Sequence, residues 1–368
     1  MIYFDHNATT PIDERVVDAM QPYLRLLYGN ASSLYRIGRI SRSAIDSARE
    51  QVAALVDASP EQIVFTSGGT EANALAMASA RGRRLVISAI EHPSVVENAM
   101  FIRDLYRRID VLSVERSGKA STGAFRRLEL QSGDFVSLML ANNETGVIQD
   151  LSGLVREAGT VGAIVHTDAV QALGKMPFSF KSLGVHFMSV SSHKIYGPKG
   201  CGALVCRSDS DIQPLLRGGD QERGLRAGTE NVAAIVGFGK AAELARLELD
   251  WRIDQMQKLR RRLEQQLRLI DGAVIFAESE RRLVNTVQFG VRGVNGEMLL
   301  MQLDRRNIAV SSGSACAAGS EQISPVLEAM GIDALLARSA IRVSLGKDNS
   351  DSEIDEFVSA LRAALAKN

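Results

Sequence analysis

Residues 187–200 read FMSVSSHKIYGPKG, and the rest of the chain is arranged around this stretch. The apolar run Phe187–Val190 predicts a buried strand. The glycines and proline that follow force a turn, and Ala203–Cys206 predicts a second strand. Lys194 therefore stands just past a strand end, where α/β folds place their chemistry. From these residues alone, an ordinary solvated lysine is an equal alternative.

The composition excludes several classes of protein. With 368 residues, the chain is long enough for a large core and two domains. Lys+Arg and Asp+Glu both number 43, and this zero net charge argues against direct nucleic-acid binding. No signal peptide and no apolar run of membrane-spanning length is recognisable, so we expect no membrane segment. The three cysteines make neither a disulfide framework nor a metal-ligand spacing, so we predict a cytoplasmic protein without a metal site.

A glycine-rich turn follows another predicted strand, Ile63–Thr66, and leads into an alanine-rich helix that begins near Glu71. The free amides and the dipole at a helix N-terminus attract anions such as phosphate. Gly69 and Thr70 are therefore candidate phosphate ligands, although a plain capped turn would contain the same residue types.

Three more predicted strands lead into polar side chains: Leu85–Ser88 to His92, Phe135–Leu140 to Asn143, and Ala163–Thr167 to Asp168 and Gln171. Asp168 is the most informative, because a carboxylate at the end of an apolar strand is costly unless it meets a cation or hydrogen-bond donors. Turn formation or helix capping explains any one of these strand ends, but it explains the whole set poorly.

A phosphate site, an acid, an imidazole and an amine at neighbouring strand ends suit pyridoxal phosphate. In such a site, Lys194 would form a Schiff base with the cofactor. Asp168 would keep the pyridine nitrogen protonated, so that the ring can accept electrons.

The chain resembles the cysteine desulfurases of the housekeeping and nitrogen-fixation type, which are class V aminotransferases, over essentially its whole length. Eight segments together carry the resemblance: Asp5–Pro11, Thr66–Asn73, Glu91-His92, Asn142–Gly146, His166–Gln171, Ser191–Gly200, Arg226–Glu230 and Ser311–Cys316. The resemblance implies an α/β fold, the aminotransferase fold type I. Its large domain has a mostly parallel sheet covered by helices on both faces, and a smaller C-terminal α+β domain follows. It also implies a homodimer.

The expected domain division follows from this fold. The large cofactor-binding domain is predicted at 14–250, and 1–13 and 251–368 are predicted to form the small domain. The pattern from Val232 to Ile270 is helical and would bridge the two, with a break predicted at Gly237-Phe238-Gly239.

The resemblance also implies roles for single residues. Lys194 matches the Schiff-base lysine and Asp168 the partner of the pyridine nitrogen. His92 matches an imidazole that stacks on the ring and moves protons. Further cofactor contacts are implied for Gly69, Thr70, Asn143, Gln171 as donor to the ring hydroxyl, Ser191, His193, and Thr229 lent by the other subunit. Arg342 matches the guanidinium that holds the substrate carboxylate, and Asn30 and Asn143 are implied near the substrate.

The stretch Ser311–Ser320 is small and polar, so we expect a mobile cysteine loop at about 311–325. Cys316 matches the nucleophile that takes sulfur from L-cysteine, although the residues alone would also fit a bystander thiol. The implied reaction gives L-alanine and a persulfide on Cys316, for delivery to a sulfur-acceptor protein such as an iron–sulfur scaffold. A selenocysteine lyase or an aminotransferase of the same fold are the alternatives. Glu321-Gln322-Ile323 departs from the usual Leu-Glu-Pro and leaves the acceptor open.

Overall fold

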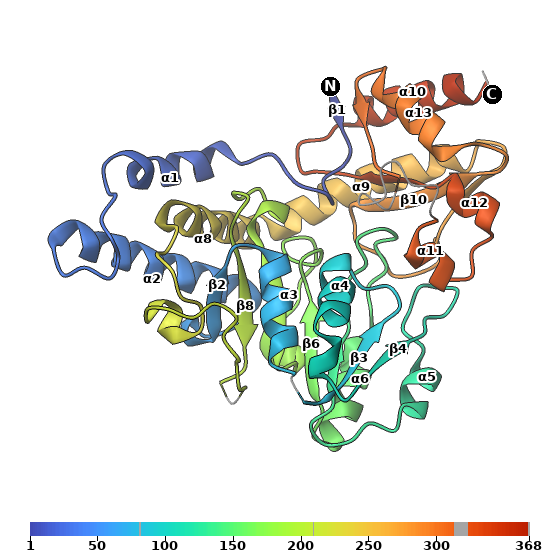
Figure 1. The fold of residues 1–368 in the computed structure, drawn as a ribbon. Helices are drawn as coiled ribbons and strands as arrows, with labels where there is room; N and C mark the ends of the chain where they lie inside the picture. The colour runs from blue at the N-terminus through green and yellow to red at the C-terminus, as the bar shows by residue number, and fades with distance from the viewer. Residues whose placement is uncertain (81, 209, 313–322, 367–368) are drawn as a thin grey trace.

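The computed structural model describes residues 1–80, 82–208, 210–312 and 323–366. Within these ranges, the main sheet has seven strands in the order β2-β8-β7-β6-β5-β3-β4 (Figure 1). Their bounds are β2 (Ile63–Thr66), β3 (Arg84–Ser88), β4 (Arg108–Leu112), β5 (Phe135–Ser137), β6 (Ile164–Asp168), β7 (Phe187–Ser191) and β8 (Gly202–Cys206). Only β8 runs antiparallel to its neighbours, so the C-terminal ends of the other strands lie at one edge.

Helices cover both faces of this sheet because the side chains of each strand alternate between the faces. In β3, Leu85 and Ile87 pack on the face covered by α3 and α4, whereas Val86 packs on the opposite face with α2, α6 and α8. The helices of this part are α1 (Glu14–Arg25), α2 (Arg36–Val56), α3 (Gly69–Ala78), α4 (Pro93–Phe101), α5 (Thr122–Arg127), α6 (Leu151–Thr160), α7 (Phe180–Leu183) and α8 (Val232–Leu247).

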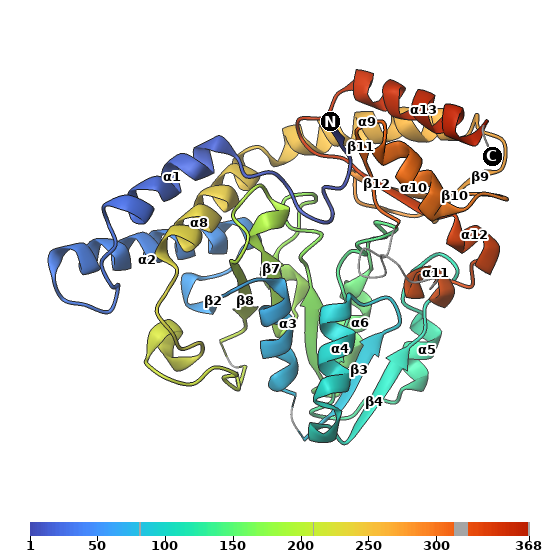
Figure 2. The same ribbon diagram turned by 45° about the horizontal axis from the view of Figure 1, so that its top comes forward.

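A second, smaller body follows. Its antiparallel sheet has the order β12-β10-β9, with β9 (Ala273–Ile275), β10 (Thr286–Val291) and β12 (Ile341–Ser344). Its helices are α9 (Leu249–Leu267), α10 (Gly296–Asp304), α11 (Pro325–Ala329), α12 (Ala334–Arg338) and α13 (Asp351–Leu365). The N-terminal strand β1 (Ile2–Tyr3) joins this body by pairing in parallel with β11 (Ile308–Ala309), as Figure 2 shows beside α9 and α13.

The fold class predicted from the sequence is confirmed: a mostly parallel sheet lies between helical layers, and a smaller α+β body follows. Ile2 and Phe4 pack in one core cluster with apolar residues between Leu259 and Ala364. The division at 14–250 and 251–368 stays a prediction.

The break predicted at Gly237-Phe238-Gly239 is wrong, because α8 runs through it and ends at Leu247. These glycines serve close packing instead. A Cβ at Gly237 would lie 2.6 Å from Met20 Sδ, and one at Gly239 would lie 2.6 Å from the Cα of Ala48. The chain bends after α8, where Glu248 separates it from α9.

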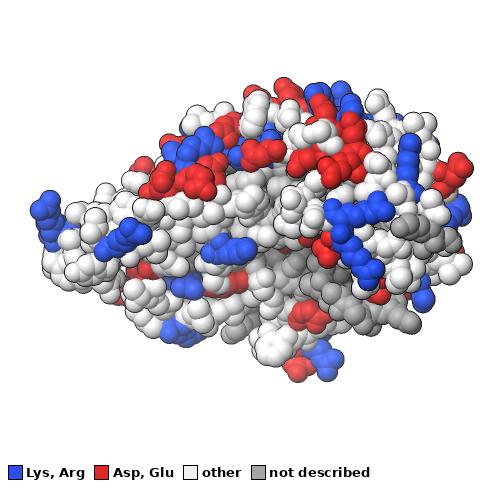
Figure 3. Space-filling model, turned by 90° about the horizontal axis from the view of Figure 1, so that it is seen from above, with Lys and Arg blue, Asp and Glu red and all other residues white. Residues whose placement is uncertain are grey.

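Charged side chains of both signs are interspersed on the face seen from above in Figure 3. Between α9 and α13, Lys258 pairs with Asp351 and Arg262 with Asp355. In the described ranges, no helix is long and apolar enough to cross a membrane.

Candidate active site

One cavity of about 350 Å³ lies at the C-terminal edge of the main sheet, where it meets the second sheet. It brings together ten of the residues singled out in the sequence: Gly69, Thr70, His92, Asn143, Asp168, Gln171, Ser191, His193, Lys194 and Arg342. Asn30 and Thr229 are exposed and do not line it. Cys316 lies outside the described residues.

Lys194 stands at the end of a single 3-10 turn, Ser192–Lys194, which follows β7 directly. Its Nζ donates to the main-chain carbonyl of Ala8 at 2.8 Å and to that of Asn7. Burial, reinforced by the positive charge of Arg342, lowers the pKa of Lys194 to about 8, although Asp168 and Asp5 act in the opposite direction. A much larger fraction of this amine is therefore neutral near pH 7 than for an exposed lysine.

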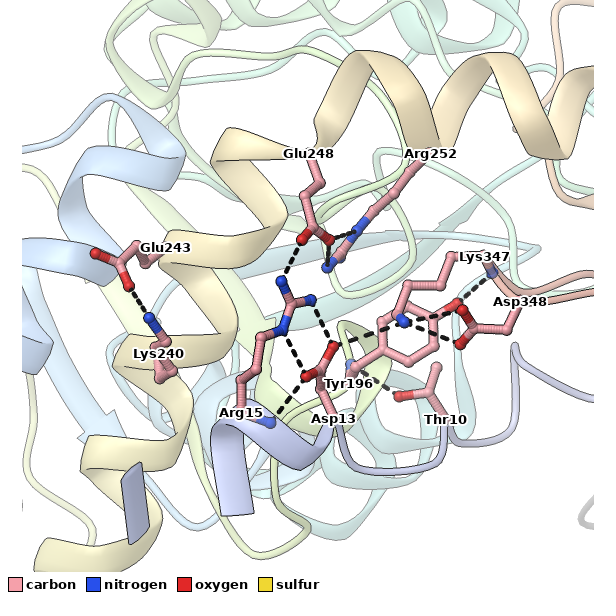
Figure 4. Close-up of polar contacts among 10 residues, drawn as sticks. All are labelled: Thr10, Asp13, Arg15, Tyr196, Lys240, Glu243, Glu248, Arg252, Lys347 and Asp348. Atoms are coloured by element: carbon pink, nitrogen blue, oxygen red, sulfur yellow. Dashed lines mark hydrogen bonds and ion pairs between the residues drawn. The ribbon is translucent and has the colours of Figure 1, made fainter. Parts of the chain in front are cut away.

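The turn after Lys194 is fixed by Tyr196, whose φ of 71° lies in the left-handed region that β-carbon-bearing residues avoid. Its N–H donates to Thr10 Oγ1 at 2.8 Å, and its hydroxyl accepts from the Lys347 N–H at 2.7 Å. The Arg252 guanidinium and the Lys347 ammonium each lie 5.1 Å from its ring centroid (Figure 4). Contacts from the N-terminal segment and from the small body thus hold the strained turn in place.

Asp168 and His92 are connected through two smaller side chains. The amide of Asn73 donates to Asp168 Oδ2 and to Ser94 Oγ, both at 2.8 Å. Ser94 Oγ lies 2.7 Å from His92 Nδ1, and the Ser94 N–H donates to the same nitrogen at 3.1 Å. Because Nδ1 accepts a main-chain N–H, the proton of a neutral His92 is on Nε2. Burial lowers the pKa of His92, which favours this neutral form.

Another part of the cavity wall has groups suited to an anion. The N-terminus of α3 provides Gly69 and Thr70. Ser191 Oγ is buried and has no hydrogen-bond partner among the described residues. His193 is also nearby, with a pKa that burial and Lys194 lower to about 4. A buried hydroxyl without a partner is costly, so this part of the wall is built for a ligand with acceptor oxygens.

Arg342, on β12, reaches the cavity from the second sheet. Its guanidinium donates to Asp5 Oδ1 at 2.6 Å and to the Asn143 carbonyl at 3.1 Å. Its Nε is buried and finds no partner in the described part of the chain. Arg342 therefore brings a positive charge to the wall of the cavity, and one of its N–H donors is unused.

Four further residues at or beside the cavity were not given roles from the sequence: Asn7, Asn73, Glu144 and Lys175. The first three lie in segments that carried the family resemblance, but their residue types alone are common in turns and caps. Lys175 lies outside those segments. The sequence offers only one indication of its burial: it stands between the mostly apolar residues Leu173-Gly174 and Met176-Pro177-Phe178. This is a weak indication, because lysines are seldom buried.

These residues fit pyridoxal phosphate. The cavity volume is typical of cofactor sites. The partnerless hydroxyl of Ser191 lies with the α3 N-terminus in the part of the wall suited to an anion. Lys194 provides an amine, and Asp168 provides a carboxylate that Asn73 and the Val170 N–H hold in place.

Comparison with known proteins agrees with this chemistry. The family model for class-V aminotransferases matches residues 2–357. The cysteine desulfurase IscS of Dictyoglomus turgidum is 38% identical over 376 residues, which cover 100% of this chain and 95% of that protein. A solved NifS-like protein has a TM-score of 0.93 at 36% identity, with 100% of both chains covered. The structure of SspA in complex with cysteine has a TM-score of 0.82 at 29% identity, and covers 95% of this chain and 100% of that one. The chain therefore belongs to the class-V aminotransferase family and, within it, to the cysteine desulfurases.

Proposed function

We propose that this protein removes sulfur from L-cysteine with the help of pyridoxal phosphate, leaving L-alanine and a persulfide on Cys316. The observation that carries the proposal is the meeting of Lys194, Asp168 and Arg342 in one cavity. Family membership supports it, as does the cysteine bound in the related SspA structure.

Bound pyridoxal phosphate supplies an electron sink for the charge left when the α-proton of the substrate is removed. Asp168 would hold the pyridine nitrogen in its protonated form, and Gly69, Thr70, Ser191 and His193 would hold the phosphate. Lys194 Nζ is suited to accept and return a proton, because its lowered pKa makes its neutral form more populated than that of an exposed lysine. His92 would present its Nε2–H to the cavity.

Arg342 would bind the carboxylate of the substrate. A guanidinium can hold two carboxylates at once through its forked donors, and Arg342 uses only part of that capacity on Asp5. A carboxylate held there would leave the amine of cysteine free to meet Lys194, which lines the same cavity.

Cys316 would be the nucleophile. Its thiolate forms a bond with the substrate sulfur while the carbon–sulfur bond breaks, and the carbon takes up a proton to become alanine. The sum is L-cysteine plus a thiol giving L-alanine plus a persulfide, which balances without a further reductant. A sulfur-acceptor protein, such as an iron–sulfur scaffold, would then take the sulfur. We also propose a reducing, cytoplasmic location, since Cys201 and Cys206 are buried free thiols.

Product analysis tests this function. Purified protein loaded with pyridoxal phosphate and given L-cysteine should release alanine in equal amount to persulfide and sulfide. A keto acid in place of alanine would indicate an aminotransferase, and turnover of selenocysteine alone would indicate a selenocysteine lyase.

The variant Cys316→Ser separates sulfur transfer from cofactor binding. A hydroxyl cannot form a persulfide, so we expect sulfide release to stop while the visible absorption of the bound cofactor stays unchanged. Both are read in one experiment with a spectrophotometer and a sulfide assay, with Cys206→Ser as the matched control. Full turnover by Cys316→Ser would show that another group is the nucleophile.

Covalent capture of pyridoxal phosphate by Lys194 should depend on pH. Only the neutral amine reacts, and the pKa of Lys194 is lowered to about 8. The capture rate of cofactor-free protein should therefore rise roughly tenfold per pH unit below 8 and level off above it. Stopped-flow absorbance measures this, with butylamine in place of the protein as the reference. A rate that keeps rising to about pH 10, as for an ordinary amine, would contradict the lowered pKa.

We further propose that Thr229 completes the phosphate site of a second copy of the chain. It is exposed and outside its own cavity, and Leu215, Leu216, Leu34 and Tyr35 form exposed apolar surface available to a partner. Cofactor retention should then fall on dilution below the dimer dissociation constant, measured by fluorescence of the released cofactor. A monomer that retains the cofactor tightly would overturn the shared site.

Asn30 stays a predicted substrate contact.

A further inference from the structure

Lys175 is a buried lysine to which the proposed function gives no task. It follows β6 in the same turn as Gln171 and is only 5% exposed. Its Nζ donates to Gln171 Oε1 at 2.7 Å and to Asn7 Oδ1 at 3.0 Å. Within the described ranges it has no carboxylate partner, and burial, with Lys194 and Arg342 nearby, lowers its pKa well below the usual value. A buried amine of this kind is costly, so its two oxygen partners are what holds it there.

The orientation of both amides is fixed by main-chain groups. Gln171 Nε2 donates to the carbonyl of Asn7 at 3.0 Å, and Asn7 Nδ2 donates to the carbonyl of Asn143 at 3.1 Å. A carbonyl only accepts, so each amide must turn its nitrogen toward it and its oxygen toward Lys175. The donors of Lys175 therefore match the acceptors that face it.

A flipped Gln171 would meet two conflicts at once. Its NH₂ group would face the Lys175 donor, and its oxygen would face the Asn7 carbonyl. In the observed orientation, Nε2 uses one hydrogen on Asn7, and the second hydrogen is left for a group in the cavity that Gln171 lines. Lys175 and the Asn7 carbonyl together thus determine that Gln171 offers the cavity a donor, not an acceptor.

We propose that Lys175 is a positioning residue that makes Gln171 a fixed hydrogen-bond donor to the ring oxygen of pyridoxal phosphate. The inference rests on the proposed function and adds to it a residue that does not touch the cofactor. Lys175 acts on the ring only through the amide of Gln171, and a negative charge on the ring oxygen is the form that this donor stabilises.

The variant Lys175→Met tests the inference, because it keeps the length of the side chain and removes its donors. Without the Lys175 donor, only the Asn7 carbonyl still holds the Gln171 amide in place, so the amide turns more readily and donates less to the cavity. A ring oxygen that loses this donor would favour the protonated form of the Lys194 nitrogen bound to the cofactor. The pKa read from the pH dependence of the visible band should rise by roughly one unit, the effect of one charge-assisted hydrogen bond. The substitution leaves the titratable groups of the cavity in place: His92, Glu144, Asp168, His193, Lys194 and Arg342.

A double-mutant cycle with Gln171→Leu separates this role from a direct charge effect. If Lys175 acts through Gln171, then Lys175→Met should shift the band no further in the Gln171→Leu background. Lys175→Gln keeps an N–H donor without the charge, and should return the pKa toward that of the wild type. If Lys175→Met does not fold, Lys175→Gln in the wild-type and Gln171→Leu backgrounds tests the same inference. Lys240→Met, at a surface ion pair on α8, is the matched control and should change nothing.

The outcomes are distinct. If the wild type forms no visible band that borohydride removes, the proposed function fails, and the inference with it. If the wild type forms the band and Lys175→Met changes only the unfolding temperature, Lys175 is a packing residue and the inference alone is wrong. An equal shift in both backgrounds would also overturn it, because Lys175 would then act by charge and not through Gln171.

Discussion

Replacing Lys194 with alanine is expected to lower the rate of alanine formation by about 10³-fold or more. The variant loses both the amine that binds the cofactor covalently and the group that moves the α-proton, and a positioned acid–base group alone contributes about 10²- to 10⁴-fold. The visible band that borohydride removes should disappear, although pyridoxal phosphate can still bind without a covalent bond. Single-turnover assays of alanine and absorbance scans measure both effects.

Lys199→Ala is the matched control for this prediction. Lys199 lies in the same stretch, five residues later, but it is exposed and does not line the cavity. Its loss should leave the band and the rate near those of the wild type. If Lys194→Ala retained a borohydride-sensitive band, another amine would be the point of attachment, and buried Lys175 would be the first to examine.

Arg342→Lys is expected to lower kcat/KM for L-cysteine by roughly 100-fold, mainly through a higher KM. An ammonium is a point charge without a fork, so it cannot keep Asp5 and also hold a substrate carboxylate at two points. The loss of one or two charge-assisted hydrogen bonds corresponds to such a factor. Steady-state kinetics with L-cysteine measures it.

The same assay with cysteamine, which lacks the carboxylate, supplies the internal control. Wild type and Arg342→Lys should process this amine equally poorly if the guanidinium acts on the carboxylate. Arg262→Lys, in an exposed ion pair with Asp355, should leave both substrates unaffected. A variant that loses activity equally toward cysteine and cysteamine would indicate that Arg342 supports the cavity through Asp5 and Asn143 instead.

The strands and their polar ends could be predicted because those signals are local. An apolar β-branched run followed by glycine or a polar cluster determines strand and turn within a few residues. Parallel strands then bring Asp168 and Lys194 to one edge of the sheet, as the fold places β6 beside β7. The family resemblance supplied Arg342, which reaches the cavity from a different sheet.

What could not be predicted depends on contacts between distant residues. Lys175 looks like a surface lysine until Asn7 is placed against it, and those residues are 168 positions apart. The glycines of α8 were misread because their close neighbours, Met20 and Ala48, come from other helices. The direction of β8 could not be predicted either. Its residues indicate a strand, but only its pairing with β2 and β7 shows that it runs antiparallel to both.

The N-terminal segment has a consequence for the order in which the protein is made. The Asn7 N–H donates to Ser344 Oγ at 2.9 Å, and Asp5 accepts from Arg342, both across 337 positions of the chain. Residues 5–7 leave the ribosome long before residues 342–344, and therefore wait for them before they reach their final places. Lys194 rests on the carbonyls of Asn7 and Ala8, so it cannot be held until that late closure has taken place. A nascent chain that ends before β12 contains all the strands of the main sheet but not the complete cavity, so cofactor capture has to wait until β12 has been made.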